Sequence, residues 1–245
     1  MRDFPAGRLA VWATAWLAGR TSYDDALDGI LGETAHRVAG LPGTEEAVSL
    51  GRALTDLRRL GERRVRLVLP VAGDVRGLPR VPGLAPLALE SGQAAVGERL
   101  VLVPEPLGPE VVQWTAFPLD GVAPPPPAPE GNLRAVSGAL DLAVGDTARA
   151  LAGLDVARWN PEVPALLVGL SRTTAAPGLP DDHDPLALSV LARAQRLGKV
   201  LDLAMADAPG AAVNHAQAAA RDEALRPLAR AVREATEAAF NAVPR

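Results

Sequence analysis

The 245-residue sequence has no cysteine, so disulfide bonds, thiolate zinc sites and cysteine nucleophiles are excluded. It also lacks a membrane span near its N-terminus, where the apolar run is shorter than the roughly 20 residues that a spanning helix needs. The same run is a poor signal peptide, because Asp3 precedes it and no clear small-residue cleavage site follows it. We therefore expect a cytoplasmic protein that does not bind membranes.

Positive charge is outweighed by negative charge, which gives the chain a net charge of −4 and a pI near 5.5. A chain of this sign does not attract phosphate backbones, so we expect no nucleic-acid binding. The basic run at 58–66 spans an expected helix end, where arginines complement the helix dipole. With 48% hydrophobic and 22% charged residues, the composition is that of a folded chain with one large domain or two small ones.

The N-terminal third has the periodicity of helices. Leu9, Trp12 and Trp16 recur at helical spacing, and Ser22 is placed to cap a second helix. Thr44 precedes two glutamates and an apolar stripe at intervals of three or four residues. These patterns predict three helices, the last beginning at Thr44.

The periodicity then changes to that of strands. Alternating or continuous apolar residues predict strands at 65–69, 98–105 and 111–119, and the PLGP turn joins the last two in an antiparallel hairpin. A short helix is expected over about 84–90 and a further short strand near 94–96. The middle of the chain is thus predicted to form a small, mainly antiparallel sheet with helices on one face.

Four consecutive prolines mark the clearest boundary, because a polyproline run neither continues a strand ladder nor joins a helix. We interpret residues 121–131 as a linker between helices plus sheet at 1–120 and a helical part at 132–245. The helical part is expected to end in a hairpin of two long helices, and it can pack with the first part as one compact unit. The predicted class is α+β. Pro227 is expected to kink the last helix or to start a new one.

The most chemical-looking stretch is LPDDHDPL, which runs from Leu179 to Leu186. Helix capping explains most of it: Asp184 and Pro185 form the arrangement of an N-cap followed by a first-position proline. The charges of Asp181 and Asp182 are favourable near the positive end of the helix dipole. Only His183 is left without a structural role, which keeps open a catalytic role for His183 with Asp181 or Asp182.

A metal site would need ligands from elsewhere in the chain, such as His36 or His215. Asp24 and Asp28 lie one helical turn apart and could share a cation with a residue such as His183. Carboxylate pairs of this kind are more often a solvated helix face, and no nucleotide, zinc or hydrolase motif occurs. We therefore expect no metal and no cofactor.

The sequence favours a non-enzymatic adaptor or regulatory module that binds a protein partner or a second copy of itself. This interpretation rests on ample folding signals without convergent catalytic residues. The alternative is an enzyme that binds a small molecule or metal between the two parts, near His183, with Arg37 or His36 as a second group. The alternative predicts that His183 faces a concave pocket.

Overall fold

The computed structural model describes residues 4–122, 132–153, 178–206 and 215–242. Six strands and seven helices lie within these ranges, and they follow one another in chain order. They are α1 (Pro5–Leu17), α2 (Tyr23–Leu31), β1 (Ala35–Ala39), β2 (Val48–Ser49), α3 (Leu50–Arg59), β3 (Arg66–Val68), α4 (Leu84–Ser91), β4 (Ala94–Val96), β5 (Leu100–Pro106), β6 (Val111–Pro118), α5 (Leu133–Gly153), α7 (Pro185–Ala206) and α9 (His215–Phe240). Most of the proline-rich segment, 123–131, lies outside the described residues.

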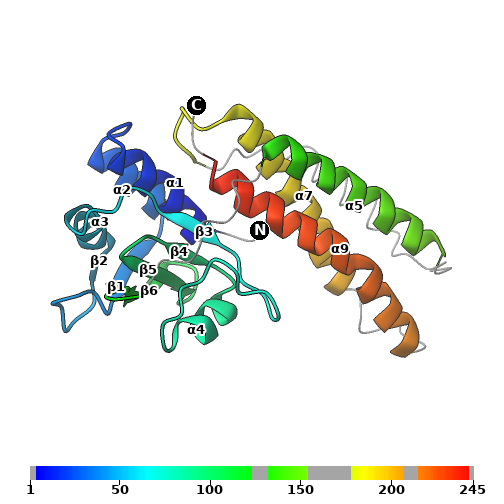
Figure 1. The fold of residues 1–245 in the computed structure, drawn as a ribbon, viewed down its shortest axis with the longest axis horizontal. Coiled ribbons are helices and arrows are strands. Elements are labelled where there is room, and N and C mark those ends of the chain that lie inside the picture. The colour runs from blue at the N-terminus through cyan, green and yellow to red at the C-terminus, as the bar shows by residue number, and fades with distance from the viewer. Residues whose placement is uncertain (1–3, 123–131, 154–177, 207–214, 243–245) are drawn as a thin grey trace.

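The six strands form one mixed sheet in the order β2-β1-β6-β5-β4-β3 (Figure 1). Among these described strands only β1 and β6 run parallel, and the other neighbouring pairs are antiparallel. The predicted β5–β6 hairpin is confirmed, with Leu102 opposite Ala116. The α+β class and the small, mainly antiparallel sheet are therefore confirmed.

The start of the third helix differs from the prediction. Val48 and Ser49 pair with β1 as the short strand β2, so α3 begins only at Leu50. Thr44 caps no helix; its hydroxyl donates to the Leu41 carbonyl oxygen at 2.9 Å inside a turn. The prediction failed because Val48 and Ser49 pair with β1, and β1 is itself held by pairing with β6, more than 70 residues away. Local periodicity carries no sign of such a partner.

Helices cover both faces of the sheet, so the prediction of helices on one face is wrong. Alternate side chains such as Leu102 and Trp114 join a core with α1 and α3, while Val101 and Val103 join a second core. Leu84 and Ala88 of α4 lie in that second core. Burial on both faces explains why β5 has a continuous apolar run where a half-exposed strand would alternate.

Beyond residue 132, helices α5, α7 and α9 lie side by side, and we call them the arm (Figure 1). Leu140 from α5, Leu191 from α7 and Leu228 from α9 are buried where the three helices meet. The predicted helical hairpin of α7 and α9 is confirmed. Pro227 lies inside α9 without starting a new helix.

The arm meets the sheet at the C-terminal end of α9. The Phe240 ring lies 5.8 Å from the Phe4 ring, measured between centroids. A Cβ atom on Gly7 would come within 2.8 Å of the Phe240 ring, so the absence of a side chain at this position lets α1 approach α9. The arm and the sheet consequently share one hydrophobic core.

A buried carboxylate holds the turn between β4 and β5. Glu62 accepts the backbone N–H groups of Glu98, Arg99 and Leu100 at 2.7, 2.6 and 3.0 Å. Burial raises the pKa of Glu62, and the three backbone bonds oppose that rise. Glu62 therefore acts as a structural anchor.

No helix in the described part of the chain has the length and apolarity to cross a membrane.

Candidate functional site

The LPDDHDPL stretch is the loop that leads into α7, and only its last two residues belong to the helix. The Leu186 backbone N–H donates to Asp184 Oδ1 at 2.8 Å, and Pro185 is the first residue of the helix. The predicted cap is therefore present. The Asp182 carboxylate forms an ion pair with Arg20, and Asp181 is exposed. Asp182 thus ties the start of α7 to the loop after α1.

His183 lies at the junction between the arm and the sheet, where it lines a small cavity together with Asp182 and Arg20. Its side chain is buried, with 2% exposure, and its Nε2 donates to the Ala239 carbonyl oxygen at 3.0 Å. That carbonyl belongs to the last turn of α9, where oxygens have no partner within the helix. Burial lowers the pKa of His183, although the bond to Ala239 opposes this. The adjacent cavity measures about 10 Å³, which is room for about one water molecule.

The other predicted ligands lie in separate places. His36 accepts the Trp114 indole N–H at Nδ1, at 3.1 Å, and its Nε2 lies 2.8 Å from the Thr34 hydroxyl. Arg37 points from β1 to the surface. Asp24 and Asp28 are both exposed on α2. Within the described ranges, no three histidine or acidic side chains gather closely enough to hold a metal ion. His215 begins α9, but its side chain is outside the described part.

The open edge of β3 is covered by side chains instead of another strand. In an antiparallel pair, the backbone groups of successive residues point alternately toward the neighbouring strand and away from it. Arg66 and Val68 point toward β4, so the N–H and C=O groups of Val65, Leu67 and Leu69 point to the open edge. We call the four side chains that bond these six groups the edge clamp. They are Thr14, Arg233, Glu237 and Asn241.

Each member of the edge clamp has a defined partner. Asn241 accepts from Leu67 N at 2.7 Å and donates to Leu67 O at 2.8 Å. Thr14 bonds both backbone groups of Val65 in the same manner, at 3.0 and 3.1 Å. Glu237 accepts from the Leu69 N–H, and Arg233 donates to the Leu69 carbonyl oxygen. Three of the four members come from the last turns of α9 or just beyond them, so the clamp fixes the arm against the sheet.

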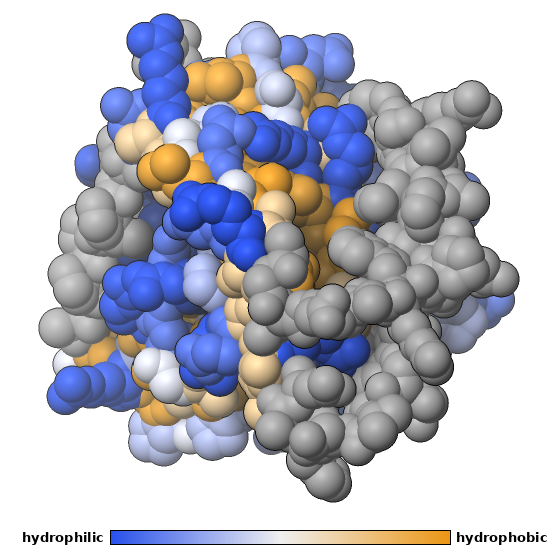
Figure 2. Space-filling model, turned by 90° about the vertical axis from the view of Figure 1, so that its right-hand side faces the viewer, coloured by the Kyte–Doolittle hydropathy of each residue, from blue (hydrophilic) through white to orange (hydrophobic). Residues whose placement is uncertain are grey.

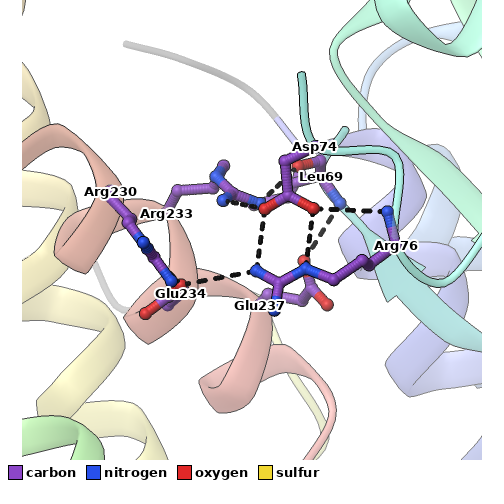
Figure 3. Close-up of polar contacts among 7 residues, drawn as sticks. All are labelled: Leu69, Asp74, Arg76, Arg230, Arg233, Glu234 and Glu237. Carbon is purple, nitrogen blue, oxygen red and sulfur yellow. Dashed lines mark hydrogen bonds and ion pairs between the residues drawn. The ribbon is translucent and has the colours of Figure 1, made fainter. Parts of the chain in front are cut away.

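A charged network extends the clamp into the loop after β3 (Figure 3). Asp74 binds Arg233 at 2.7 Å and Arg76 at 2.8 Å, and both arginines lie on the same carboxylate in the figure. The bonds from Arg76 and then from Arg233 hold the pKa of Asp74 well below its usual range. Glu234 lies 2.9 Å from Arg230 Nε and 3.8 Å from the Arg76 guanidinium. Ion pairs thus connect the loop after β3 to the charged face of α9.

The same loop forms one wall of a wide groove, which we define as the space between residues 69–82 and the arm. The groove has a volume of about 2180 Å³. Its lining includes the exposed side chains Val71 and Val75 from the loop, both 43% exposed, and Leu186 from α7, 37% exposed. Arginines of α9 lie on the opposite wall. Figure 2 shows hydrophilic and apolar side chains interspersed on the face of the molecule that it presents.

The sequence carried part of the signal for this groove. Arg226, Arg230, Arg233 and Glu237 recur at helical spacing and identify a charged face of α9. Nothing in the loop sequence indicates that Asp74 would meet that face. Asn241 likewise has no sequence signal, because its partner on β3 lies 174 residues away.

The fold and the groove define an α+β protein in which a helical arm and a surface loop border an open groove with charged and apolar walls. The chain belongs to the Rv1486c-like protein family: the model of the N-terminal domain matches residues 6–130 and that of the C-terminal domain matches residues 134–237.

Relatives in mycobacteria match over nearly the whole chain. "Uncharacterized protein Rv1486c" of Mycobacterium tuberculosis (strain ATCC 25618 / H37Rv) is 30% identical over 282 residues, covering 98% of this chain and 96% of the relative. "Uncharacterized protein ML1804" of Mycobacterium leprae (strain TN) is 27% identical, covering 98% and 97%. No solved structure matches the chain significantly.

Proposed function

We propose that this protein is a non-enzymatic adaptor or regulatory module of the cytoplasm that binds a protein partner in the groove. The helices and sheet of residues 1–120 supply the loop wall, and the helical part at 132–245 supplies the arm. A second copy of the chain is the other form that this partner can take.

The size and lining of the groove carry the proposal. Small-molecule sites usually measure about 300–1,000 Å³ and enclose most of their ligand. A groove of about 2180 Å³ has room for a polypeptide segment. Val71, Val75 and Leu186 offer apolar contact on its walls, and exposed apolar side chains near a polar rim are typical of protein interfaces.

The bonding of the polar groups also supports a binding module. Among the described residues, the carboxylates of Asp74, Glu234 and Glu237 are held by arginines or by a backbone N–H. His183 is bound to a helix carbonyl beside a cavity of about 10 Å³. Groups bonded in this way position structure, whereas a general acid or base must reach a substrate.

Photo-crosslinking from the groove tests the proposal in the native host. A photoreactive amino acid replaces Val75 in the groove, and the matched control replaces Leu107, which is 51% exposed and lies outside the groove lining. We expect a discrete adduct from position 75 that position 107 does not give. The partner is then identified by mass spectrometry and purified, and Val75→Asp is expected to weaken its binding roughly tenfold, about 1.4 kcal/mol.

Two results decide the form of the partner or refute the proposal. An adduct with a second copy of the chain assigns the groove to a homodimer. Equal labelling from positions 75 and 107, or no adduct at either, contradicts a groove-bound partner.

A further inference from the structure

We infer that the groove binds an extended acidic peptide segment in which apolar residues are interspersed. This inference rests on the proposed function and adds the chemistry of the partner. It follows from the charges that line the groove and from the bonds that those charges already make.

The charge of the groove has the opposite sign to that of the whole chain. Nine arginine or lysine side chains and five aspartate or glutamate side chains line it, a balance of +4 within a chain of net charge −4. A cleft lined by one sign of charge concentrates ligands of the opposite sign. An acidic ligand is therefore favoured in the groove.

The acidic side chains of the lining are already occupied. Asp74 is bound by Arg76 and Arg233, and Glu234 by Arg230. Asp184 caps α7 through the Leu186 N–H, and Glu237 holds the edge of β3. Asp202, the fifth, also has a partner. These carboxylates already accept hydrogen bonds from donors within the protein, so they are not available to bind a basic ligand.

In contrast to these carboxylates, three basic side chains of the lining have no ion-pair partner in the described part of the protein. They are Arg80 from the loop, Arg134 from α5 and Lys199 from α7. Arg80 and Arg134 are exposed, so a ligand in the groove can reach both side chains. Carboxylates from a partner would give these cations charge-assisted hydrogen bonds.

A polypeptide fits the groove better than a nucleic acid does. Phe4 is the one aromatic residue among the described lining, whereas single-stranded nucleic acids bind by stacking bases on several aromatic rings. Val71, Val75 and Leu186 instead match apolar side chains at intervals along a peptide.

Selection from a random peptide library tests the inference with the full-length protein. Peptides of about 12 residues, a length typical of groove-bound segments, are selected on the wild type, on Arg134→Glu/Lys199→Glu and on the control Arg37→Glu/Arg63→Glu. The control reverses two exposed arginines outside the groove lining. Circular dichroism establishes that each variant is folded.

The wild type and the control are expected to enrich aspartate and glutamate together with valine or leucine. The groove variant is expected to lose that enrichment, and a selected acidic peptide is expected to bind it at least about tenfold more weakly by fluorescence anisotropy. Affinity for the wild type should also fall as salt is raised, since the groove is open to solvent.

Enrichment of lysine and arginine by the wild type, or equal binding by the groove variant and the control, overturns the inference. So does tighter binding of a single-stranded oligonucleotide than of the selected peptide. Crosslinking from position 75 distinguishes the two levels, because it does not depend on peptide charge. An adduct there without acidic enrichment refutes the acidic ligand alone, and its absence refutes the proposed function as well.

Discussion

Replacing Asn241 by alanine removes both hydrogen bonds that its side chain makes to Leu67 on the open edge of β3. Leu67 is fully buried, with 0% exposure, so its N–H and C=O would be left with little access to water. An unsatisfied buried donor or acceptor costs about 1–3 kcal/mol. Two such groups, partly relieved by water entering the truncated site, predict a loss of about 2–4 kcal/mol in the free energy of unfolding.

Equilibrium unfolding in urea, followed by tryptophan fluorescence, measures this loss. Asn132→Ala is the matched control, because Asn132 Oδ1 accepts one N–H, from Arg134, at an exposed helix start. Loss of such a cap costs about 1 kcal/mol. If Asn241→Ala costs no more than Asn132→Ala, the edge clamp does not hold the arm to the sheet, and the reasoning from buried unsatisfied groups fails.

Three further predictions concern other buried positions. Burial lowers the pKa of His183 below the 6.5 of the unfolded chain, so the unfolded state takes up the proton first as the pH falls below about 6.5. Acidification from about pH 7.5 to 5.5 should therefore reduce the free energy of unfolding more in the wild type than in His183→Gln, in which the side-chain amide can still donate to Ala239. Glu62 and Glu237, whose pKa values are raised, act in the opposite direction in both proteins and cancel in that difference; equal pH slopes would refute the prediction. Glu62→Ala leaves three backbone N–H groups without their acceptor and should cost about 3 kcal/mol or more in urea unfolding, whereas a loss below about 1 kcal/mol would mean that water replaces the carboxylate. Gly97→Ala places a Cβ atom 2.4 Å from Glu62 Oε1 and should cost about 1–3 kcal/mol; a double-mutant cycle with Glu62→Ala should show that most of this cost disappears, and full additivity would contradict the clash.

Features determined by neighbouring residues could be predicted from the sequence. The start of α7 at Pro185, the strand at 94–96 and the β5–β6 hairpin all follow from caps, turns and alternation within a few residues. Each of these patterns involves residues that are close together in the sequence, so their spacing in the structure is set by the local backbone. The α+β class follows from their sum.

Features determined by distant partners could not be predicted in this way. β1 contains only one strong strand former, Val38, and it exists because β6 lies beside it. His183 looked free because its acceptor, the Ala239 carbonyl, is backbone and lies 56 residues away. The groove depends on how the arm is set against the loop, which is a property of the edge clamp and not of any periodicity.

Side chains of the edge clamp bond the backbone groups of β3 that a seventh strand would otherwise bond. This arrangement has a consequence for solubility. An open sheet edge is a template on which another chain can add a strand and begin to aggregate. The opposite edge, β2, is only two residues long and offers little to pair with. Thr14 of α1 bonds Val65, but Leu67 and Leu69 on the β3 edge are protected only while α9 stays docked. Loosening the arm would therefore expose backbone groups to which another chain can pair before the rest of the molecule unfolds. Substitutions at Asn241 should consequently lower the yield of soluble protein by more than their effect on stability suggests.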